Sequence, residues 1–216
     1  MHCEYLYDNI HGEYITINVH RVRMAGGFTE KEREQIRIAL LSAGYKLSAE
    51  CGIKKMTVAL VAKSSGVAVG SFYNFFDSKE DFVLALIQEA EKEAEIRMVS
   101  AFAKDGTISL KKFLQTFREN FRPETNFFLK ISLEDWMWLK SHLTDTTYFN
   151  TSSDLQKIEW LLPKIKGVRE NIDPGVVVNF IKSIYAMYQN RETLFEESLE
   201  TNVDLIFESI YRYMKA

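Results

Sequence analysis

The sequence predicts an all-α protein, and three observations support this fold class. Only 3 Pro and 10 Gly occur among 216 residues, so long helices can run without interruption. Apolar residues recur at three- and four-residue spacing in several segments, and helix-capping residues stand where those segments begin. A hydrophobic content of 46% is enough for a buried core in one or two domains.

Residues 1–27 form an N-terminal extension or arm that differs from the helical remainder. Tyr14-Ile15-Thr16-Ile17 is β-prone, and His11-Gly12 can form a turn before it, so the segment predicts a short hairpin or a loose arm. One hypothesis is that translation begins at Met24, because the recognisable elements follow it. Detection of a peptide from residues 5–20 in natively expressed protein would contradict that hypothesis.

The first helix is predicted to begin after Thr29, because Thr29 and Glu32 have the spacing of a capping box. The helix should end at Gly52. Its apolar stripe consists of Ile36, Leu40, Ala43 and Leu47.

Two short helices are predicted next, separated by a tight turn. Thr57 can cap a helix over 58–64, Ser65-Gly66 breaks it, and another helix follows over 68–75.

Capping and breaking residues also divide the rest of the chain. Ser78 and Asp81 form a second capping box, which starts a long helix reaching about residue 102. Asp173-Pro174 is a specific helix start. The remaining helices are expected at 108–121, 124–141, 153–165, 174–190 and 194–214.

Charge is distributed unevenly along the chain. The net charge is −3, but residues 21–79 carry ten Lys or Arg and five Asp or Glu, a local charge of +5. Residues 1–20 have a charge of −3, and residues 80–216 have a charge of −5. A basic segment on an acidic chain is a weak indication of a phosphate-binding surface.

The segment TVALVAKSSGVAVGSFYNFFDSK, residues 57–79, carries the functional information. Ala62 is small where two helices must cross closely, Gly66 can make the turn, and Phe72 can pack back between the helices. This spacing fits a helix-turn-helix, in which the second helix enters the major groove of DNA.

The same segment resembles the N-terminal domain of TetR-family (tetracycline-repressor-like) regulators. The resemblance covers residues 29 to about 90 and rests on Thr57, Ala62, Gly66, Val67, Gly70, Phe72, Tyr73, Phe76 and Lys79. It implies a three-helix DNA-binding domain over 28–77, followed by a helical ligand-binding and dimerisation domain over 78–216. The implied protein is a ligand-responsive repressor that binds a palindromic operator in double-stranded DNA as a homodimer.

The resemblance assigns DNA contacts residue by residue. The helix opened by Thr57 would receive a phosphate, and Tyr73, Asn74 and Lys79 would contact others. The tip of the recognition helix would face the base edges with Ala68, Val69, Gly70 and Ser71. This tip has no Arg, Lys, Gln or Asn, so we expect readout through thymine methyl groups and the Ser71 hydroxyl. The neighbouring Phe side chains are expected in the core, while Tyr73 could contact DNA or be buried.

The C-terminal half is rich in aromatic residues, which serve a helical core or a ligand pocket. In the resembled family this domain encloses a small-molecule site, and an aromatic cavity suits a small apolar effector. The residues expected to line it are Phe117, Phe121, Trp136 and Trp160.

The helix after Pro174 is apolar around most of its circumference, which is more than one core-facing stripe requires. With the last helix it predicts a four-helix interface across a two-fold axis, as the resemblance also implies. The interface residues expected are Val177, Ile181, Ile184, Tyr188, Phe207 and Ile210.

Other classes of protein find little support in the sequence. Cys3 and Cys51 form no CxxC pair, and the histidines show no metal-ligand spacing, so reduced thiols and no metal or cofactor are expected. The chain has no signal peptide and no apolar run of the roughly 18–20 residues that a membrane span needs, which predicts a cytoplasmic protein without a membrane partner. No nucleophile–base constellation indicates an enzyme. The alternative left open is a helical small-molecule-binding protein or enzyme with a vestigial helix-turn-helix.

Overall fold

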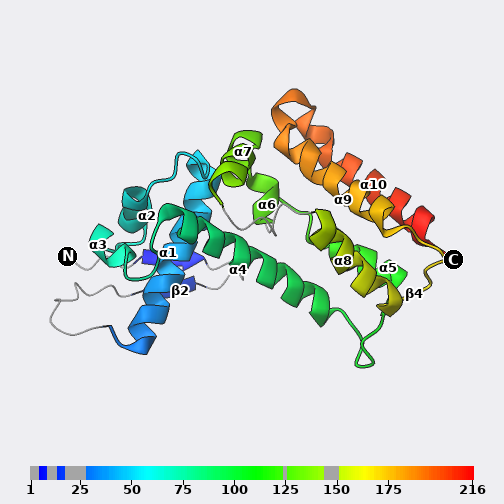
Figure 1. Ribbon diagram of the computed structural model, residues 1–216, viewed down its shortest axis with the longest axis horizontal. Coiled ribbons are helices and arrows are strands. Elements are labelled where there is room, and N and C mark those ends of the chain that lie inside the picture. Colours follow the sequence, from blue (N-terminus) through cyan, green and yellow to red (C-terminus); the bar gives the residue numbers. More distant parts are fainter. Residues whose placement is uncertain (1–4, 9–13, 18–27, 124–125, 144–150) are drawn as a thin grey trace. The chain divides into compact units, whose positions relative to one another are not determined.

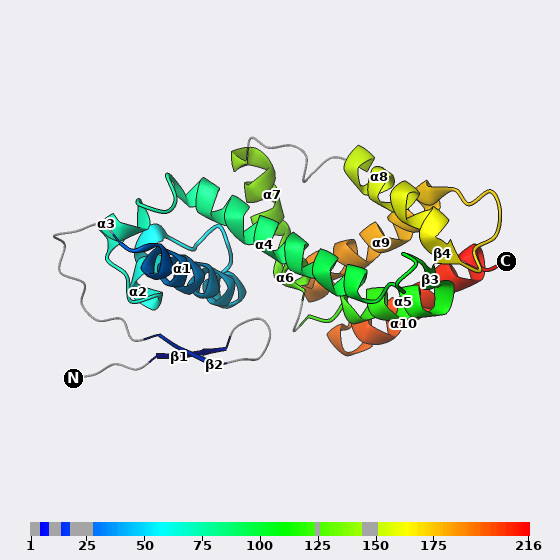
Figure 2. The same ribbon diagram turned by 90° about the horizontal axis from the view of Figure 1, so that it is seen from below.

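The computed structural model describes residues 5–8, 14–17, 28–123, 126–143 and 151–216 (Figures 1 and 2). The chain forms two compact units, Met1–Gln88 and Glu89–Ala216. Helix α4 (Lys79–Ser100) begins in the first unit and ends in the second. The described residues are predominantly helical, which confirms the predicted fold class.

A short hairpin precedes the helices. Strand β1 (Tyr5–Asp8) pairs antiparallel with β2 (Tyr14–Ile17), with Tyr5 opposite Ile17 and Asp8 opposite Tyr14. The pairing agrees with the hairpin expected from the β-prone residues. The turn expected at His11-Gly12 lies outside the described residues.

Helix α1 (Glu30–Cys51) begins as the capping residues predict. The Thr29 hydroxyl accepts the Glu32 N–H at 3.3 Å, and the Glu32 carboxylate accepts the Thr29 N–H at 2.8 Å. The helix ends at Gly52, whose φ of 82° is open to glycine and strained for other residues. Its N–H still reaches the Ser48 carbonyl, at 3.2 Å.

The first unit is completed by α2 (Val58–Ser64), α3 (Val69–Phe72) and the first half of α4. Figure 1 shows these elements gathered beside α1. A cluster of three aromatic rings lies between them: Phe82 of α4 packs 5.4 Å from Phe72 and 5.0 Å from Phe76, measured between ring centroids. The predicted domain boundary at 77/78 differs from the unit boundary because Phe82 belongs to this core.

The second unit is a helical assembly built around α9 (Pro174–Gln189), which packs against α6, α8 and α10. In Figure 1, α9 and α10 run side by side. The other helices are α5 (Leu110–Glu119), α6 (Phe127–Lys130), α7 (Leu133–His142), α8 (Thr151–Leu161) and α10 (Leu199–Met214), with short 3-10 turns η2 (Leu162–Lys164), η3 (Arg191–Thr193) and η4 (Glu196–Ser198).

The helix predicted over 124–141 is divided into α6 and α7. Ile131 is extended, with φ −70° and ψ 120°, and Ser132 then caps α7 by accepting the Asp135 N–H at 3.1 Å. The Ser132 hydroxyl also donates to the Asp135 carboxylate, at 3.0 Å. This second use of the Ser-x-x-Asp pattern breaks the helix, because the cap must leave helical geometry.

Two very short strands join distant parts of the second unit. Strand β3 (Ile108–Ser109) pairs in parallel with β4 (Ile165–Lys166), and Ile108 lies opposite Ile165. Both isoleucines are buried. The pairing therefore fixes the start of α5 beside the segment that follows α8.

A polar network connects α5, α9 and α10 beside the core. The Arg118 guanidinium donates to Glu200 and to Asp204, each at 2.7 Å, and to the Phe121 carbonyl at 3.3 Å. The Tyr188 hydroxyl donates to the other Glu200 oxygen. Helices α5 and α9 therefore supply one residue each, and α10 supplies two, to a connected set of charge-assisted hydrogen bonds.

Candidate nucleic-acid interface

The turn between α2 and α3 is closed by backbone and hydroxyl hydrogen bonds. The Ser65 hydroxyl donates to the Val61 carbonyl at 2.9 Å, and Gly66 follows with a φ of 71°. This left-handed residue redirects the chain so that the Val67 N–H reaches the Ala62 carbonyl at 2.9 Å. Ala62 is fully buried, as the close helix crossing requires.

Helix α3 is held by Phe72, which is fully buried against Phe76 and Phe82. Anchoring on this side turns Ala68, Val69 and Gly70 toward solvent. A Cβ added at Gly70 would meet no heavy atom within 4 Å, so this tip is open. Three of the four predicted base-facing residues thus share an exposed surface, and Ser71 is half-buried beside them.

Tyr73 and Asn74 continue this surface beyond α3, and both are exposed. The Tyr73 ring packs edge-on against Phe72 at 5.4 Å, so its position is defined although it is 52% exposed. Exposure leaves the Tyr73 hydroxyl available for a phosphate contact.

Arg33 of α1 is a residue of this surface that the sequence analysis missed. Its Nη2 donates to the Asn74 carbonyl at 3.3 Å, and its guanidinium lies 5.1 Å from the centre of the Phe75 ring. The contact brings an exposed cation to the end of α3. The motif gives no signal for it, because Arg33 precedes Asn74 by 41 positions.

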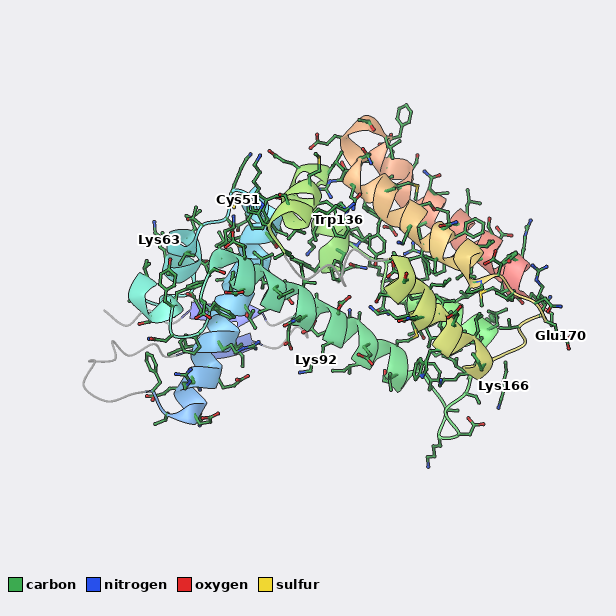
Figure 3. The ribbon with its side chains drawn as sticks, in the orientation of Figure 1. Cys51, Lys63, Lys92, Trp136, Lys166 and Glu170 are labelled. Carbon is green, nitrogen blue, oxygen red and sulfur yellow. The ribbon has the colours of Figure 1, made fainter. Side chains whose placement is uncertain are left out.

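Thr57 and Lys79 occupy the ends of the helix-turn-helix segment. The Thr57 hydroxyl caps α2 by accepting the Leu60 N–H at 3.2 Å. The Lys79 ammonium donates to the Lys54 carbonyl at 2.9 Å, which ties the start of α4 to the loop before α2. Lys55 and Lys63 are also exposed in this unit, with Lys63 on the outer side of α2 (Figure 3).

Comparison with protein families identifies this arrangement. Residues 40–86 match the sequence model described as bacterial regulatory proteins, tetR family. This part of the chain is therefore a tetR-family DNA-binding domain. The match contains α2, α3 and the turn between them, so the protein is a DNA-binding transcriptional regulator. No curated protein matches the chain.

Solved structures of other regulators share the fold of this chain. A TetR-family transcriptional regulator from Rhodococcus superposes with a TM-score of 0.58 at 19% identity, covering 84% of this chain and 100% of the other. NalD, the secondary repressor of a multidrug efflux pump in Pseudomonas aeruginosa, gives 0.54 at 16% identity over 84% and 98%. SmeT in complex with triclosan gives 0.59 at 14% identity over 84% and 92%.

Four aromatic residues are expected to line a ligand pocket. These residues occupy different environments in the structure. Phe121 is 1% exposed, with its ring 5.3 Å from Phe117, so the two lie together in the core of the second unit. Trp136 is half-buried on α7 (Figure 3). Trp160 is 59% exposed on α8, and the Lys164 ammonium lies 3.4 Å from the centre of its ring.

Most of the residues expected at a dimer interface are buried within the single chain. Ile181 is half-buried, and the others are buried: Val177, Ile184, Tyr188, Phe207 and Ile210. Helices α6, α8 and α10 of the same chain pack against α9. The place of these residues in a dimer interface stays a prediction.

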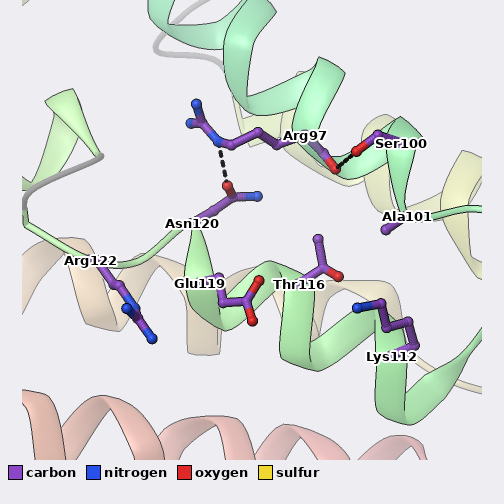
Figure 4. A pocket seen from close by; sticks show the side chains of 8 residues that line it. All are labelled: Arg97, Ser100, Ala101, Lys112, Thr116, Glu119, Asn120 and Arg122. Atoms are coloured by element: carbon purple, nitrogen blue, oxygen red, sulfur yellow. Dashed lines mark hydrogen bonds between the residues drawn. The ribbon is translucent and has the colours of Figure 1, made fainter. Parts of the chain in front are cut away.

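In the second unit, a groove lies between the C-terminal end of α4 and helix α5 (Figure 4). Its volume is about 640 Å³. Polar and charged side chains dominate the lining, which consists of Arg97, Ser100, Ala101, Lys112, Thr116, Glu119, Asn120 and Arg122. None of the four aromatic residues expected at a ligand site belongs to this lining.

Among the described residues, no group of three or more His, Cys, Asp or Glu is placed to hold a metal ion. No described helix combines the length and hydropathy needed to cross a membrane.

Proposed function

We propose that this regulator acts in the cytoplasm as an effector-responsive repressor, and that two copies bind a palindromic operator through α3. The exposed tip of α3 in a tetR-family domain carries this proposal. Two copies related by a two-fold axis would present two such tips to half-sites one helical turn apart.

The chemistry of the tip indicates how an operator would be read. Val69 is 46% exposed and Ala68 is also exposed, so methyl groups would meet thymine methyl groups in the major groove. Tyr73, Asn74 and the lysines of the first unit would contact DNA phosphates, and these contacts would fix the position of the protein along the duplex. We expect affinity to depend strongly on salt, because phosphate contacts release counterions.

The dimer would form through the outward faces of α9 and α10. Helix α9 exposes Asn179, Ser183 and Ala186, which are small and follow one another at helical spacing. Helix α10 exposes Leu205, at 56%, together with Ser209. Small residues allow close helix approach, and an exposed leucine can fill the contact.

An effector would act by favouring a conformation whose two α3 helices no longer fit successive major grooves. A coupling free energy of about 1–3 kcal/mol would change operator affinity roughly 5–150-fold. The sequence predicts an apolar effector beside Phe117, Phe121, Trp136 and Trp160. The polar lining of the groove between α4 and α5 favours a polar effector instead.

The test begins with selection of bound sequences from a random pool of duplex DNA, followed by fluorescence anisotropy with the selected operator. Gly70→Glu should abolish binding, because a carboxylate at the open tip would face phosphates and bases. Gln115→Glu adds the same charge at an exposed position of α5 and should leave affinity unchanged.

Two results would count against the proposal. Selection that enriches no sequence would favour a small-molecule-binding protein or enzyme with a vestigial helix-turn-helix. Gly70→Glu binding the operator as tightly as Gln115→Glu would remove α3 from the interface.

A further inference from the structure

The groove between α4 and α5 is cationic within an acidic part of the chain. Residues 80–216 have a net charge of −5. The groove lining nevertheless contains three cationic side chains, those of Arg97, Lys112 and Arg122, and one carboxylate, that of Glu119. A second carboxylate, that of Glu93, lies near Arg97 outside the lining. Positive charge is concentrated in this groove although residues 80–216 are net negative, and this favours an anionic ligand.

The Arg97 side chain is held in place by a buried amide. Its Nε donates to the side-chain amide oxygen Oδ1 of Asn120 at 2.8 Å, and Asn120 is 7% exposed (Figure 4). The Asn120 backbone carbonyl in turn accepts the Asn126 side-chain amide, at 2.7 Å. On the other side, the Arg97 Nη1 lies 3.9 Å from Glu93. Arg97 is therefore oriented before a ligand arrives, which lowers the entropy lost on binding.

Hydroxyl groups complete the lining. Thr116 is buried on α5, and Ser100 is exposed at the end of α4 with its hydroxyl donating to the Arg97 carbonyl at 2.8 Å. Ala101 supplies the one apolar side chain in the lining. A volume of about 640 Å³ lies within the range of small-molecule sites. Size, charge and hydrogen-bonding groups together describe a site for a small polar molecule.

We propose that this groove binds a small polar organic anion that carries carboxylate or phosphate groups. The planar Arg97 guanidinium would bind an anionic group with two parallel hydrogen bonds, and Lys112 would neutralise a second charge. This binding depends only on the residues that line the groove, and it does not require that the protein bind DNA.

The effect of the anion on DNA rests on the proposed function. Arg97 lies on α4, the helix that starts at Lys79 in the DNA-binding unit. An anion held by Arg97 of α4 and Lys112 of α5 would join the two helices, in addition to the hydrogen bond from Arg97 to Asn120. The ligand would then favour the conformation in which α4 and α5 are joined in this way, and such a preference is the requirement for coupling to operator affinity.

Isothermal titration calorimetry on the full chain tests the proposal without DNA. The probes are citrate and glucose 6-phosphate as anions, with glucose and 1-naphthol as neutral polar and neutral apolar controls. At least one anion should bind, and binding should weaken as ionic strength rises. Lys112→Met should weaken anion binding at least tenfold, because it removes one charge at an exposed position. Lys111→Met is the matched control, since Lys111 is its exposed neighbour outside the groove lining and should leave binding unchanged.

A second variant and a DNA titration separate the remaining outcomes. Arg97→Met should also lose anion binding, with circular dichroism confirming that the variant is folded. Failure of both anions to bind, equal losses in Lys112→Met and Lys111→Met, or binding of 1-naphthol alone would overturn the anion site. Failure of the wild type to bind a selected operator would overturn the proposed function and leave the titration result intact.

Discussion

Gly44 on α1 faces Phe82 on α4 so closely that a Cβ atom at position 44 would lie 2.6 Å from the Phe82 Cζ. The same atom would lie 2.9 Å from the Leu86 Cδ1. Both partners are buried, so neither side chain has open space to move into. A glycine inside a long helix normally costs stability, and here it allows α1 and α4 to approach.

We expect Gly44→Ala to lower the free energy of unfolding by about 1–3 kcal/mol, as overpacking of a close core does, and Gly44→Leu to lower it further. Urea denaturation followed by circular dichroism measures the change. Gly70→Ala is the control, because the site of its Cβ is open and alanine is the better helix former. Equal stabilities of Gly44→Ala and Gly70→Ala would contradict the close approach.

Lys79→Ala should weaken binding to all DNA sequences alike and lower the salt slope by about one, as expected for a lost phosphate contact. Anisotropy titrations at several salt concentrations measure both effects. Lys92→Ala removes an exposed lysine from the same helix in the second unit and should leave the slope unchanged. If Lys79→Ala also leaves the salt slope unchanged, Lys79 does not contact a DNA phosphate.

Arg118→Met should destabilise the second unit by about 1.5–3 kcal/mol, since it removes hydrogen bonds to two carboxylates from a largely buried position. Arg212→Met is the matched control. Its pair with Glu208 lies on the surface of α10, where such pairs contribute about 0–1 kcal/mol. Comparable losses in the two variants would show that the Arg118 network adds nothing beyond a surface pair.

The pH dependence of stability should report on Glu200. Burial acts to raise the pKa of Glu200, but hydrogen bonds from Tyr188 and Arg118 outweigh it and hold the pKa below 4.5. A lowered pKa in the folded state stabilises the protein above pH 4.5, and this contribution is lost as pH falls through the folded pKa. The difference in Tm between wild type and Glu200→Gln should therefore be largest near neutral pH and shrink below pH 4.5. A difference that stays constant from pH 7 to pH 3 would contradict this assignment.

The proposed dimer should dissociate when its outward face is charged. Leu205→Glu should sediment as a monomer at micromolar concentration, because a carboxylate in an apolar contact would be desolvated without a partner. Leu194→Glu makes the same change at an exposed leucine outside α9 and α10 and should remain dimeric. A monomeric wild type would reject the dimer.

The DNA-binding unit was predicted well because its signals are local. Thr29 and Thr57 cap helices through residues three positions away, and the bounds of α2 agree with the predicted 58–64. The division of α6 from α7 was missed although Ser132 and Asp135 carry a comparable capping signal. The signal was overlooked because apolar residues continue on both sides of it.

Features that depend on distant residues were beyond the sequence. Hydropathy does not distinguish an aromatic side chain that lines a cavity from one that fills a core. The ring of Phe121, which we expect beside a ligand, lies among the rings of Phe117, Tyr185 and Phe207. The sequence likewise could not place α6 and α8, which pack against α9. The groove was missed because its polar residues look like ordinary surface positions of α4 and α5.

The pairing of β3 with β4 has a consequence for the order in which the chain folds. It closes a loop that contains α5 through α8, and closing about 57 residues costs roughly 3–4 kcal/mol in chain entropy by the logarithmic dependence on loop length. The first unit closes shorter loops, and local contacts form faster than distant ones. During synthesis the DNA-binding unit can therefore fold while Ile165 is still untranslated, whereas the second unit must wait for it.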